Sequence, residues 1–530
     1  MMKQPGMCVV IGCDRNLRFS NTSNGSTFQV KKRDHNIYLR DKQNLEVRLE
    51  RKQFEDQPET MFKESNVVYE IAERTRAIGH GGIGAIHKLV CRLGLDDAIN
   101  RNISLLKYHV PYWESDHVLN IAYNVLSGGT CLEDIERLRN DETYMNGLAA
   151  ERIPDPTTAG DFLRRFDEDW IFGLQEVINE VRQKVWGLQG PSFRKEAVID
   201  VDGTIAATTG ECKEGMEIAY NGIWGYAPLI VTLANTNEVL YLVNRPGNRP
   251  SSDGAAAWLD RAIDLTAPVF KQVWLRGDTD FSLTANFDRW DEKVGFVFGY
   301  DAKPNLVRLA GALPESSWKA LERPRRYEVK TIERRRPENV KHQVIKEREF
   351  QNIRLQSEHV AEFDYRPSQC KQTYRMVVVR KNLTIEKGET RLFDEIRYFF
   401  YVTNDRRMTG PEVVLFANDR CNQENVISQL KSGVNALRMP SDGLVSNWAY
   451  MVIAALAWNL KAWYGLVTQS AASSREILRM EFKRFLASYI QIPCQVVPTG
   501  RRLVFRILSH SRHLATYFST FEYIRKLSFA

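Results

Sequence analysis

The chain has 530 residues, which at roughly 100–200 residues per domain predicts two to four domains. Hydrophobic residues make up 43% of the chain and charged residues 26%, a composition that excludes a disordered protein and supports a sizeable core. The net charge of +7 is a mild excess, which is compatible with a nucleic-acid partner but does not indicate one by itself.

Several other classes are excluded by simple features of the chain. The eight cysteines are scattered without a Cys-x-x-Cys pair, so we expect reduced thiols and no zinc ribbon. The N-terminus lacks the basic start and apolar core of a signal peptide. The longest apolar run, residues 448–458, falls short of the ~18 residues that indicate a membrane span. We therefore expect a soluble, cytoplasmic protein.

The first part of the chain divides into a lead-in and a helical region. Residues 1–65 are polar and weakly periodic, and we expect them to form a poorly defined lead-in. Residues 66–194 place apolar residues at three- and four-residue steps between Gly and Asp punctuation, which predicts short helices. Short helices joined by tight turns are typical both of a helix-turn-helix that binds DNA and of an ordinary helical bundle, and the sequence does not separate the two.

From residue 195 the pattern changes to short β-rich runs. Three such runs form a predicted meander, a helix follows over 251–265, and two more strands follow over 271–281 and 295–300. This order is typical of an α/β ribonuclease H-like core. We expect the core, a β-rich insertion and a helical C-terminal region to occupy the following ranges: 195–304 with 396–440, 305–395, and 441–530.

The first β-rich run ends in two carboxylates. Asp200 and Asp202 lie two residues apart in "AVIDVDGTI", so both side chains emerge on the same face of a strand. Two carboxylates held close together repel each other unless a cation lies between them, and Mg²⁺ is bound by one or two carboxylates together with phosphate oxygens. The alternative is an ordinary strand-end turn, where Asp and Gly are common.

Two later segments carry matching polar residues. "LRGDTDF" ends a second strand in Asp278, one strand–strand–helix unit after the first pair. In a predicted helix over 411–433, Arg420, Glu424 and Lys431 fall within about 40° of each other at 100° per residue. Apolar residues on the side towards the core are Val426, Leu430 and Val434. Taken alone, the polar ridge is also typical of a solvated face with an i, i+4 ion pair.

These segments together carry a family resemblance. The set of "DVDGT", "LRGDTDF" and an Arg, three residues, Glu, six residues, Lys helix resembles the DDE transposases of bacterial insertion sequences. It is most similar to the insertion-sequence 1380 family, which bears a Tyr-Arg-Glu-Lys signature, and the resemblance covers roughly residues 65–510. The signature's Tyr position is Ala417 here, and Phe416 adjoins it.

The resemblance implies a function and a site. Asp202, Asp278 and Glu424 would be the catalytic, metal-binding acids for two Mg²⁺ or Mn²⁺ ions, and Arg420 and Lys431 would contact phosphate. Such a metal pair can cleave DNA at transposon ends and transfer the exposed 3′-hydroxyl into target DNA. The implied protein is a cut-and-paste transposase with endonuclease activity, nucleoid-associated in a bacterium. Its partners would be the terminal inverted repeats, target DNA and at least one further copy of the chain.

The predicted insertion carries a second candidate DNA contact. A basic strip over 323–348 would follow the phosphate backbone in a sequence-independent, salt-sensitive way. Its candidate contacts are Arg325, Arg326, Arg334, Arg335 and Arg336. Trp318 is a candidate for stacking on an unpaired base, although an ordinary packed Trp is the commoner case.

Two other functions compete with transposition. A haloacid dehalogenase-type phosphatase also begins with "DxDGT" and would use Asp200 as nucleophile and Asp202 as general acid. Almost 200 residues precede the motif here, and a strand meander follows it, which both disfavour that class. A decayed transposase that binds DNA without catalysis is the third possibility, and the three intact acids disfavour it.

Overall fold

The chain divides into two units, Met1–Val67 and Val68–Ala530, and the elements discussed below lie in the second. The structure is a computed structural model that describes residues 36–37, 39–40, 42–44, 47, 75–323, 344, 348, 351–387, 390–499, 502–508 and 511–529. The predicted lead-in over 1–65 therefore lies almost wholly outside the described residues. Within the described ranges, every helix is too short or too polar to span a membrane.

Short helices fill the region after the lead-in, as the apolar periodicity predicted. Three of them begin at Asp caps: the side chain of Asp141 accepts from the backbone N–H of Thr143, that of Asp155 from Thr158, and that of Asp167 from Trp170. The helices are α2 (Ile83–Leu93), α3 (Leu95–Asn102), α4 (Glu114–Leu126), α5 (Ile135–Arg139), α6 (Glu142–Gly147), α7 (Pro156–Leu163) and α8 (Glu168–Gly187).

A mixed sheet forms the centre of the fold. Its strands here are β2 (Glu196–Gly203), β6 (Leu229–Leu233), β7 (Glu238–Val243), β8 (Gln272–Gly277) and β9 (Gly295–Tyr300), in the order β7-β6-β2-β8-β9. The pairs β2–β6 and β6–β7 are antiparallel, whereas β2–β8 and β8–β9 are parallel. Helix α9 (Ala255–Thr266) connects β7 to β8. This is the strand order of a ribonuclease H-like core, as the sequence predicted.

A small second sheet interrupts the meander. It consists of β3 (Ala206–Ala207), β4 (Glu217–Ile218) and β5 (Trp224–Tyr226), in the order β3-β5-β4, and lies in the chain between β2 and β6. The sequence pattern did not predict it as a separate element.

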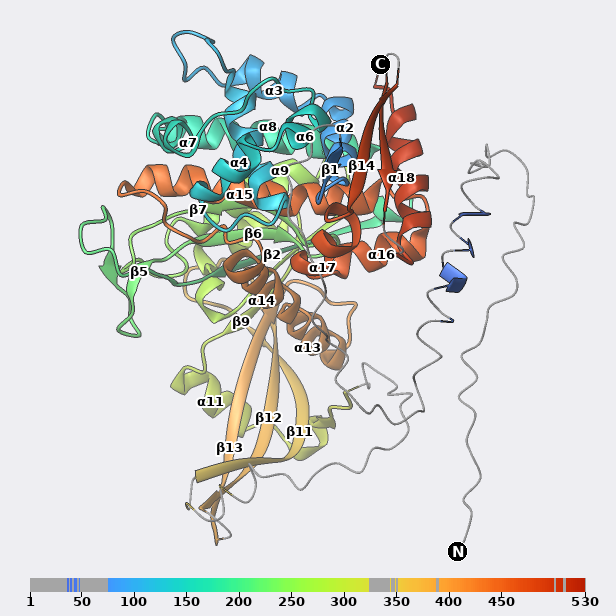
Figure 1. Ribbon diagram of the computed structural model, residues 1–530. Coiled ribbons are helices and arrows are strands. Elements are labelled where there is room, and N and C mark those ends of the chain that lie inside the picture. The colour runs from blue at the N-terminus through green and yellow to red at the C-terminus, as the bar shows by residue number, and fades with distance from the viewer. Residues whose placement is uncertain are drawn as a thin grey trace, which may run out of the picture. The chain divides into compact units, whose positions relative to one another are not determined.

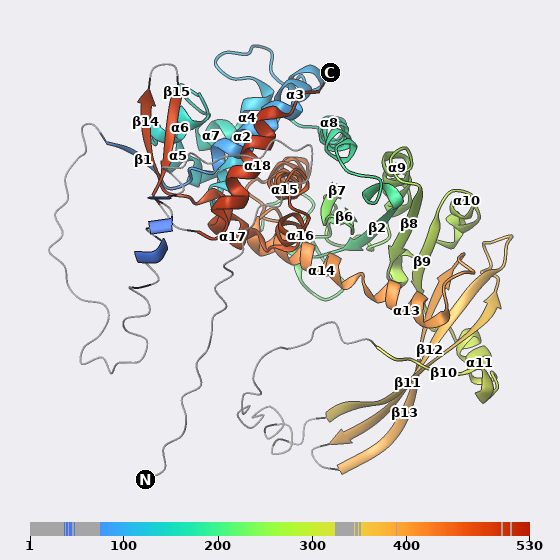
Figure 2. The same cartoon turned by 90° about the vertical axis from the view of Figure 1, so that its right-hand side faces the viewer.

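The predicted β-rich insertion is present, but it continues the central sheet. Its strands are β10 (Lys319–Ala320), β11 (Gln351–Tyr365), β12 (Tyr374–Lys387) and β13 (Thr390–Thr403). Residues Phe400–Thr403 of β13 pair antiparallel with β9, which joins the two sets of strands in one sheet of nine. The predicted boundary at 395/396 was wrong, because β13 crosses it without a break. The far ends of β11–β13 extend away from the core strands (Figures 1 and 2).

The helix predicted over 411–433 is divided. It consists of α13 (Gly410–Asn418), α14 (Cys421–Ser428) and a π-helical turn over Gln429–Gly433. At the break, the backbone N–H of Arg420 donates to Ala417 O, and Phe416 O accepts both from the backbone N–H of Asp419 and from the side chain of Arg276. A single helix was predicted, and the contact at its interruption comes from Arg276, a residue 140 positions away.

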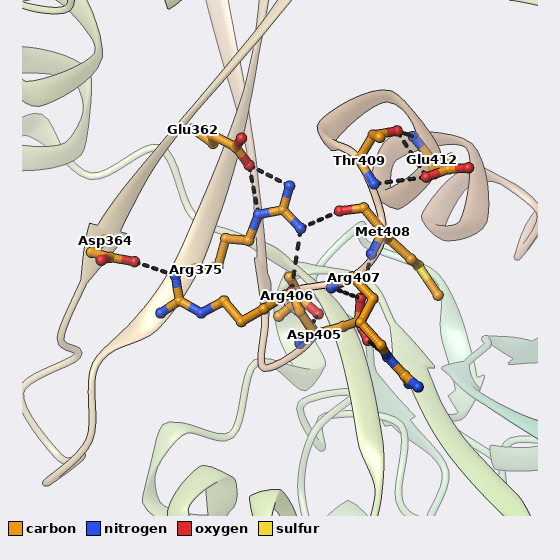
Figure 3. Close-up of polar contacts among 10 residues, drawn as sticks. Glu362, Asp364, Arg375, Asp405, Arg406, Arg407, Met408, Thr409 and Glu412 are labelled. Carbon is orange, nitrogen blue, oxygen red and sulfur yellow. Dashed lines mark hydrogen bonds and ion pairs between the residues drawn. The ribbon is translucent and has the colours of Figure 1, made fainter.

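A hydrogen-bonded cluster fixes the start of α13 (Figure 3). Arg375 on β12 donates to Glu362 on the neighbouring strand β11 at 2.6 Å and also to the carbonyls of Asp405 and Met408. The carboxylate of Asp405 accepts from the backbone N–H of Met408 at 2.7 Å. The guanidinium therefore ties two inserted strands to the turn between β13 and α13.

The C-terminal region was predicted to be helical, but it also contains a β-hairpin. The hairpin strands β14 (Cys494–Thr499) and β15 (Arg502–Ile507) form a sheet with β1 (Arg76–Ile78) in the order β1-β14-β15. The helices are α15 (Leu444–Leu466), α16 (Ala471–Arg479), α17 (Phe482–Phe485) and α18 (Leu514–Lys526). The prediction missed the hairpin because a strand from the other end of the chain completes its sheet.

Helix α15 contains the longest apolar run and is buried by the rest of the fold. Its Asn459 accepts from the backbone N–H of Val239 at 2.9 Å and donates to Val239 O at 3.0 Å. The amide side chain thus satisfies the free edge of β7. Figure 2 shows α9 on one side of the central sheet, with α13 and α14 on the other.

Candidate active site

The two predicted acidic strand ends lie at one edge of the sheet. Asp202 is near the end of β2, and Asp278 directly follows the parallel strand β8. Asp200 on β2 and Arg276 on β8 are register partners, and each acid lies two residues after one of them: Asp202 after Asp200, and Asp278 after Arg276. The side chains of Asp202 and Asp278 are 16% and 36% exposed, so both are open to a ligand while largely enclosed by protein.

Arg420 links the two acids. Its Nη1 lies 2.9 Å from Oδ2 of Asp202, and its Nη2 lies 3.8 Å from Oδ2 of Asp278. The guanidinium therefore stands at the place where a cation offsets the repulsion between the two carboxylates. The sequence predicted this convergence of strand ends and helix, and the structure brings these three residues together.

Burial dominates the electrostatics of the two acids. It raises the pKa of Asp202 to about 6, with Asp278 adding to the increase and Arg420 opposing it. Burial also raises the pKa of Asp278, again against the effect of Arg420. Both carboxyl groups are thus more costly to ionise than free Asp, and an added cation lowers that cost.

Glu424 lies next to this group, without joining it in a carboxylate cluster. The preceding residue, Gln423, is buried and donates to Ile230 O at 3.0 Å, and Ile230 is the register partner of Asp202 on β6. Glu424 is exposed and within electrostatic reach of Arg420. The packed position on this part of α14 is that of Gln423, so the Glu424 side chain is left at the surface.

The side chains at this edge do not form a complete set of metal ligands. In the part of the chain that the structure describes, no three His, Cys, Asp or Glu side chains lie close enough together to hold a metal ion. The donors that do converge are carboxylate oxygens, which Mg²⁺ and Mn²⁺ prefer, and a guanidinium occupies the intervening cationic position. The residues therefore fit a divalent cation chemically, with Glu424 as the adjacent third acid.

Lys431 also faces the site, from the π-helical turn. It is exposed at its end, burial lowers its pKa, and the charge of Asp202 opposes that decrease. Arg420 and Lys431 thus both interact with Asp202, although the helix between them is not continuous. On the opposite side, the expected core residues Val426, Leu430 and Val434 are buried.

Asp200 is excluded as a nucleophile. Its side chain is 1% exposed, and its two oxygens accept from Nε and Nη2 of Arg276 at 2.6 and 2.8 Å. A substrate phosphate has no access to a carboxylate that is enclosed and paired in this way. The phosphatase alternative requires Asp200 as its nucleophile and was therefore wrong.

Of the remaining predicted DNA contacts, the structure describes only Trp318. Trp318 is buried, with the guanidinium of Arg380 4.4 Å from its ring centroid, which is the ordinary packed environment given above as the commoner case. Arg380 is held there by Glu315 at 2.7 Å. The five arginines of the basic strip, Arg325, Arg326, Arg334, Arg335 and Arg336, lie outside the described residues.

Sequence reasoning missed three residues that shape the site. Arg276 and Gln423 anchor its elements, and Gly299 on β9 lets the backbone of the Asp278 turn approach closely. A Cβ at position 299 would lie 2.9 Å from the backbone nitrogen of Thr279. Arg276 had a usable signal, because it precedes Asp278 by the same two residues by which Asp200 precedes Asp202.

Comparison with known proteins identifies a family and a similar solved structure. The family described as "Transposase DDE domain group 1" matches residues 67–529. The chain is also similar to the solved "Cryo-EM structure of piggyBac transposase synaptic complex with hairpin DNA", at 12% identity and a TM-score of 0.30, over 78% of this chain and 86% of that chain. No curated protein sequence matches the chain.

Proposed function

Because the chain belongs to the family of transposases with a DDE domain of group 1, we propose that it cuts DNA at the ends of a mobile element and joins them to target DNA. It is a transposase, an enzyme that acts on DNA. The observation that carries the proposed site is the convergence of Asp202 and Asp278 on one guanidinium at the edge of the central sheet.

In this proposal, Asp202, Asp278 and Glu424 hold two divalent cations, Mg²⁺ or Mn²⁺. When bound, the cations supply activation of the attacking water or 3′-hydroxyl and stabilisation of the leaving oxygen. The protein's part is to keep the acids ionised and oriented. With a pKa of about 6, Asp202 is mainly ionised at pH 7 and above.

In the same proposal, Arg420 and Lys431 bind phosphate groups of the DNA. The planar guanidinium of Arg420 matches two oxygens of a phosphodiester, and Lys431 offers a point charge beside it. Arg420 is held by acids before DNA arrives, so an incoming phosphate competes with Asp202 for the same donors. Binding of DNA and release of the acids are therefore coupled through one side chain.

The residue spacing supports a finer identity. Arg420, Glu424 and Lys431 keep the Arg-x₃-Glu-x₆-Lys pattern of the insertion-sequence 1380 family, which supports a bacterial element and cut-and-paste transposition. In this view, the helices of 66–194 bind terminal inverted repeats, and the inserted strands with their basic strip follow the DNA backbone. Pairing of two transposon ends would require at least a homodimer.

Separate substitutions test the catalytic acids. Asp202→Asn, Asp278→Asn and Glu424→Gln should each abolish Mg²⁺-dependent cleavage of linear DNA that carries the sequences flanking the coding region, while binding of that DNA persists. Glu292→Gln is the matched control, because Glu292 is an exposed carboxylate at the end of α10 (Phe287–Asp291). Cleavage that survives all three substitutions would refute the assignment.

A further inference from the structure

We propose that Asp200 and Arg276 form a positioning pair that sets where Asp202, Asp278 and Arg420 meet. The inference rests on the proposed function, because it concerns the same site. Neither residue contacts substrate in this scheme. Their role is to hold three separate elements, the ends of β2 and β8 and the break between α13 and α14, in one arrangement.

The first part of the pair joins the two strands. Asp200 and Arg276 are direct register partners on the parallel strands β2 and β8. Nε and Nη2 of Arg276 donate to the two oxygens of Asp200 at 2.6 and 2.8 Å. Both side chains are almost fully buried, at 3% and 1% exposure. Because each catalytic acid follows two residues later, this two-point contact fixes the relative height of Asp202 and Asp278.

The second part joins the strands to the helices. Nη1 of Arg276 donates to Phe416 O at 2.7 Å, and the Phe416 ring lies 5.0 Å from the guanidinium carbon. In an uninterrupted α-helix, Phe416 O would accept from the backbone N–H of Arg420. Here that N–H donates to Ala417 O, Phe416 O accepts a longer bond of 3.3 Å from the backbone N–H of Asp419, and α13 ends. Arg276 thereby stabilises the turn that directs the Arg420 side chain towards the acids.

A buried ion pair is a costly way to join two strands, because both charges lose their hydration. Well-packed apolar residues often stabilise a fold equally well. We therefore assign the pair a role in positioning, which its three directed hydrogen bonds fulfil and apolar contacts would not. Arg182 and Glu238 provide a comparison within the same chain. They form an equally buried pair, 3.0 Å apart, between α8 and β7, with β6 separating β7 from β2.

Binding of Mn²⁺ to the DNA-free, full-length protein tests the pair, with free Mn²⁺ followed by electron paramagnetic resonance. Arg276→Gln should weaken Mn²⁺ binding by about 10–100-fold, as substitutions behind metal ligands typically do. Arg276→Lys, which keeps the charge and a shorter donor, should restore part of the affinity. In cleavage assays, both variants should raise the half-saturating Mg²⁺ concentration more than they lower the rate at saturating Mg²⁺.

Arg182→Lys is the matched control and should lower the melting temperature without changing Mn²⁺ affinity. Wild-type Mn²⁺ affinity in folded Arg276→Lys and Arg276→Gln would overturn the positioning role, as would an equal loss of affinity in Arg182→Lys. If Arg276→Gln does not fold, Arg276→Lys alone decides by the same criterion. Failure of the proposed function is distinguishable, because then Asp202→Asn and Asp278→Asn would leave Mn²⁺ binding and cleavage unchanged.

Discussion

Arg420 donates a 2.9 Å hydrogen bond to Asp202, although the two residues lie 218 positions apart in the chain. In the absence of another cation, this contact shields the acid that the proposed mechanism requires. The same contact makes Arg420 both a competitor of a metal ion and a donor for phosphate.

Replacement of Arg420 should therefore separate metal binding from catalysis. Arg420→Gln removes a positive charge beside two carboxylates, so the Mn²⁺ affinity of the DNA-free protein should rise, on the order of tenfold. Cleavage should fall because the phosphate contact is lost. Arg420→Lys, which keeps the charge, should leave Mn²⁺ affinity near that of the wild type. A decrease in Mn²⁺ affinity in Arg420→Gln would contradict the competition.

The pKa of Asp202 sets a pH dependence for metal binding. Because burial raises this pKa to about 6, protons should displace Mn²⁺ as the pH falls below 6, whereas an ordinary Asp would remain ionised to about pH 4. The half-saturating Mn²⁺ concentration should rise about tenfold per pH unit below 6, as expected for exchange with one proton. Titrations of Mn²⁺ binding between pH 5 and 8 measure this half-saturating concentration. A concentration that does not change with pH would disprove the predicted competition between protons and Mn²⁺.

The same shift predicts the sign of a stability change in the metal-free protein. An acid whose pKa is raised by folding binds its proton more tightly in the folded state, so its contribution to stability is lost as pH rises from about 4 to 6. Asp202→Asn should abolish this part of the pH dependence and raise the melting temperature at pH 7. Thermal melts of both proteins at pH 5 and pH 7 provide the comparison.

Gly299 offers a test of the Asp278 turn. In Gly299→Ala, the new Cβ would lie 2.9 Å from Thr279 N and 3.1 Å from the carbonyl carbon of Asp278, so this backbone must move. Misplacement of a catalytic group by about 1 Å costs on the order of 100-fold in rate, and we expect a loss of that size in cleavage. Gly311→Ala is the control, because its nearest neighbour lies at 3.9 Å.

Glu238 should be important for stability and irrelevant to metal binding. It is fully buried and accepts from Arg182, Trp186, Trp463 and Thr236 at 2.6–3.0 Å. Glu238→Gln leaves the Arg182 charge uncompensated and should lower the free energy of unfolding by about 3–5 kcal/mol. Denaturant unfolding measures the change in the free energy of unfolding. A loss of less than about 1 kcal/mol, the value typical of an exposed ion pair, would contradict the prediction.

Sequence patterns predicted the parts of the fold that depend on local periodicity. The five core strands follow from short β-rich runs, and Asp202 and Asp278 follow from acids at the ends of two of them. The expected core positions Val426 and Leu430 are buried for the same reason. Helical spacing, taken together with the two acidic strand ends and the family resemblance, selected Arg420, which the structure brings to both acids.

The errors arose where distant residues decide the local structure. The break after α13 is contacted by Arg276, and the β14–β15 hairpin pairs with a strand at Arg76–Ile78. The exposed position of Glu424 follows from Gln423, whose buried amide reaches Ile230 O on a strand 193 residues earlier. None of these contacts leaves a periodic signal in the sequence around the affected element.

Strand β13 is a single span of 14 residues, with one end among the far tips of the insertion and the other hydrogen-bonded to β9. Only a short turn, braced by Arg375, separates it from the helix that precedes Arg420. The far ends of the insertion and the strand ends that carry Asp202 and Asp278 consequently belong to one continuous hydrogen-bonded sheet.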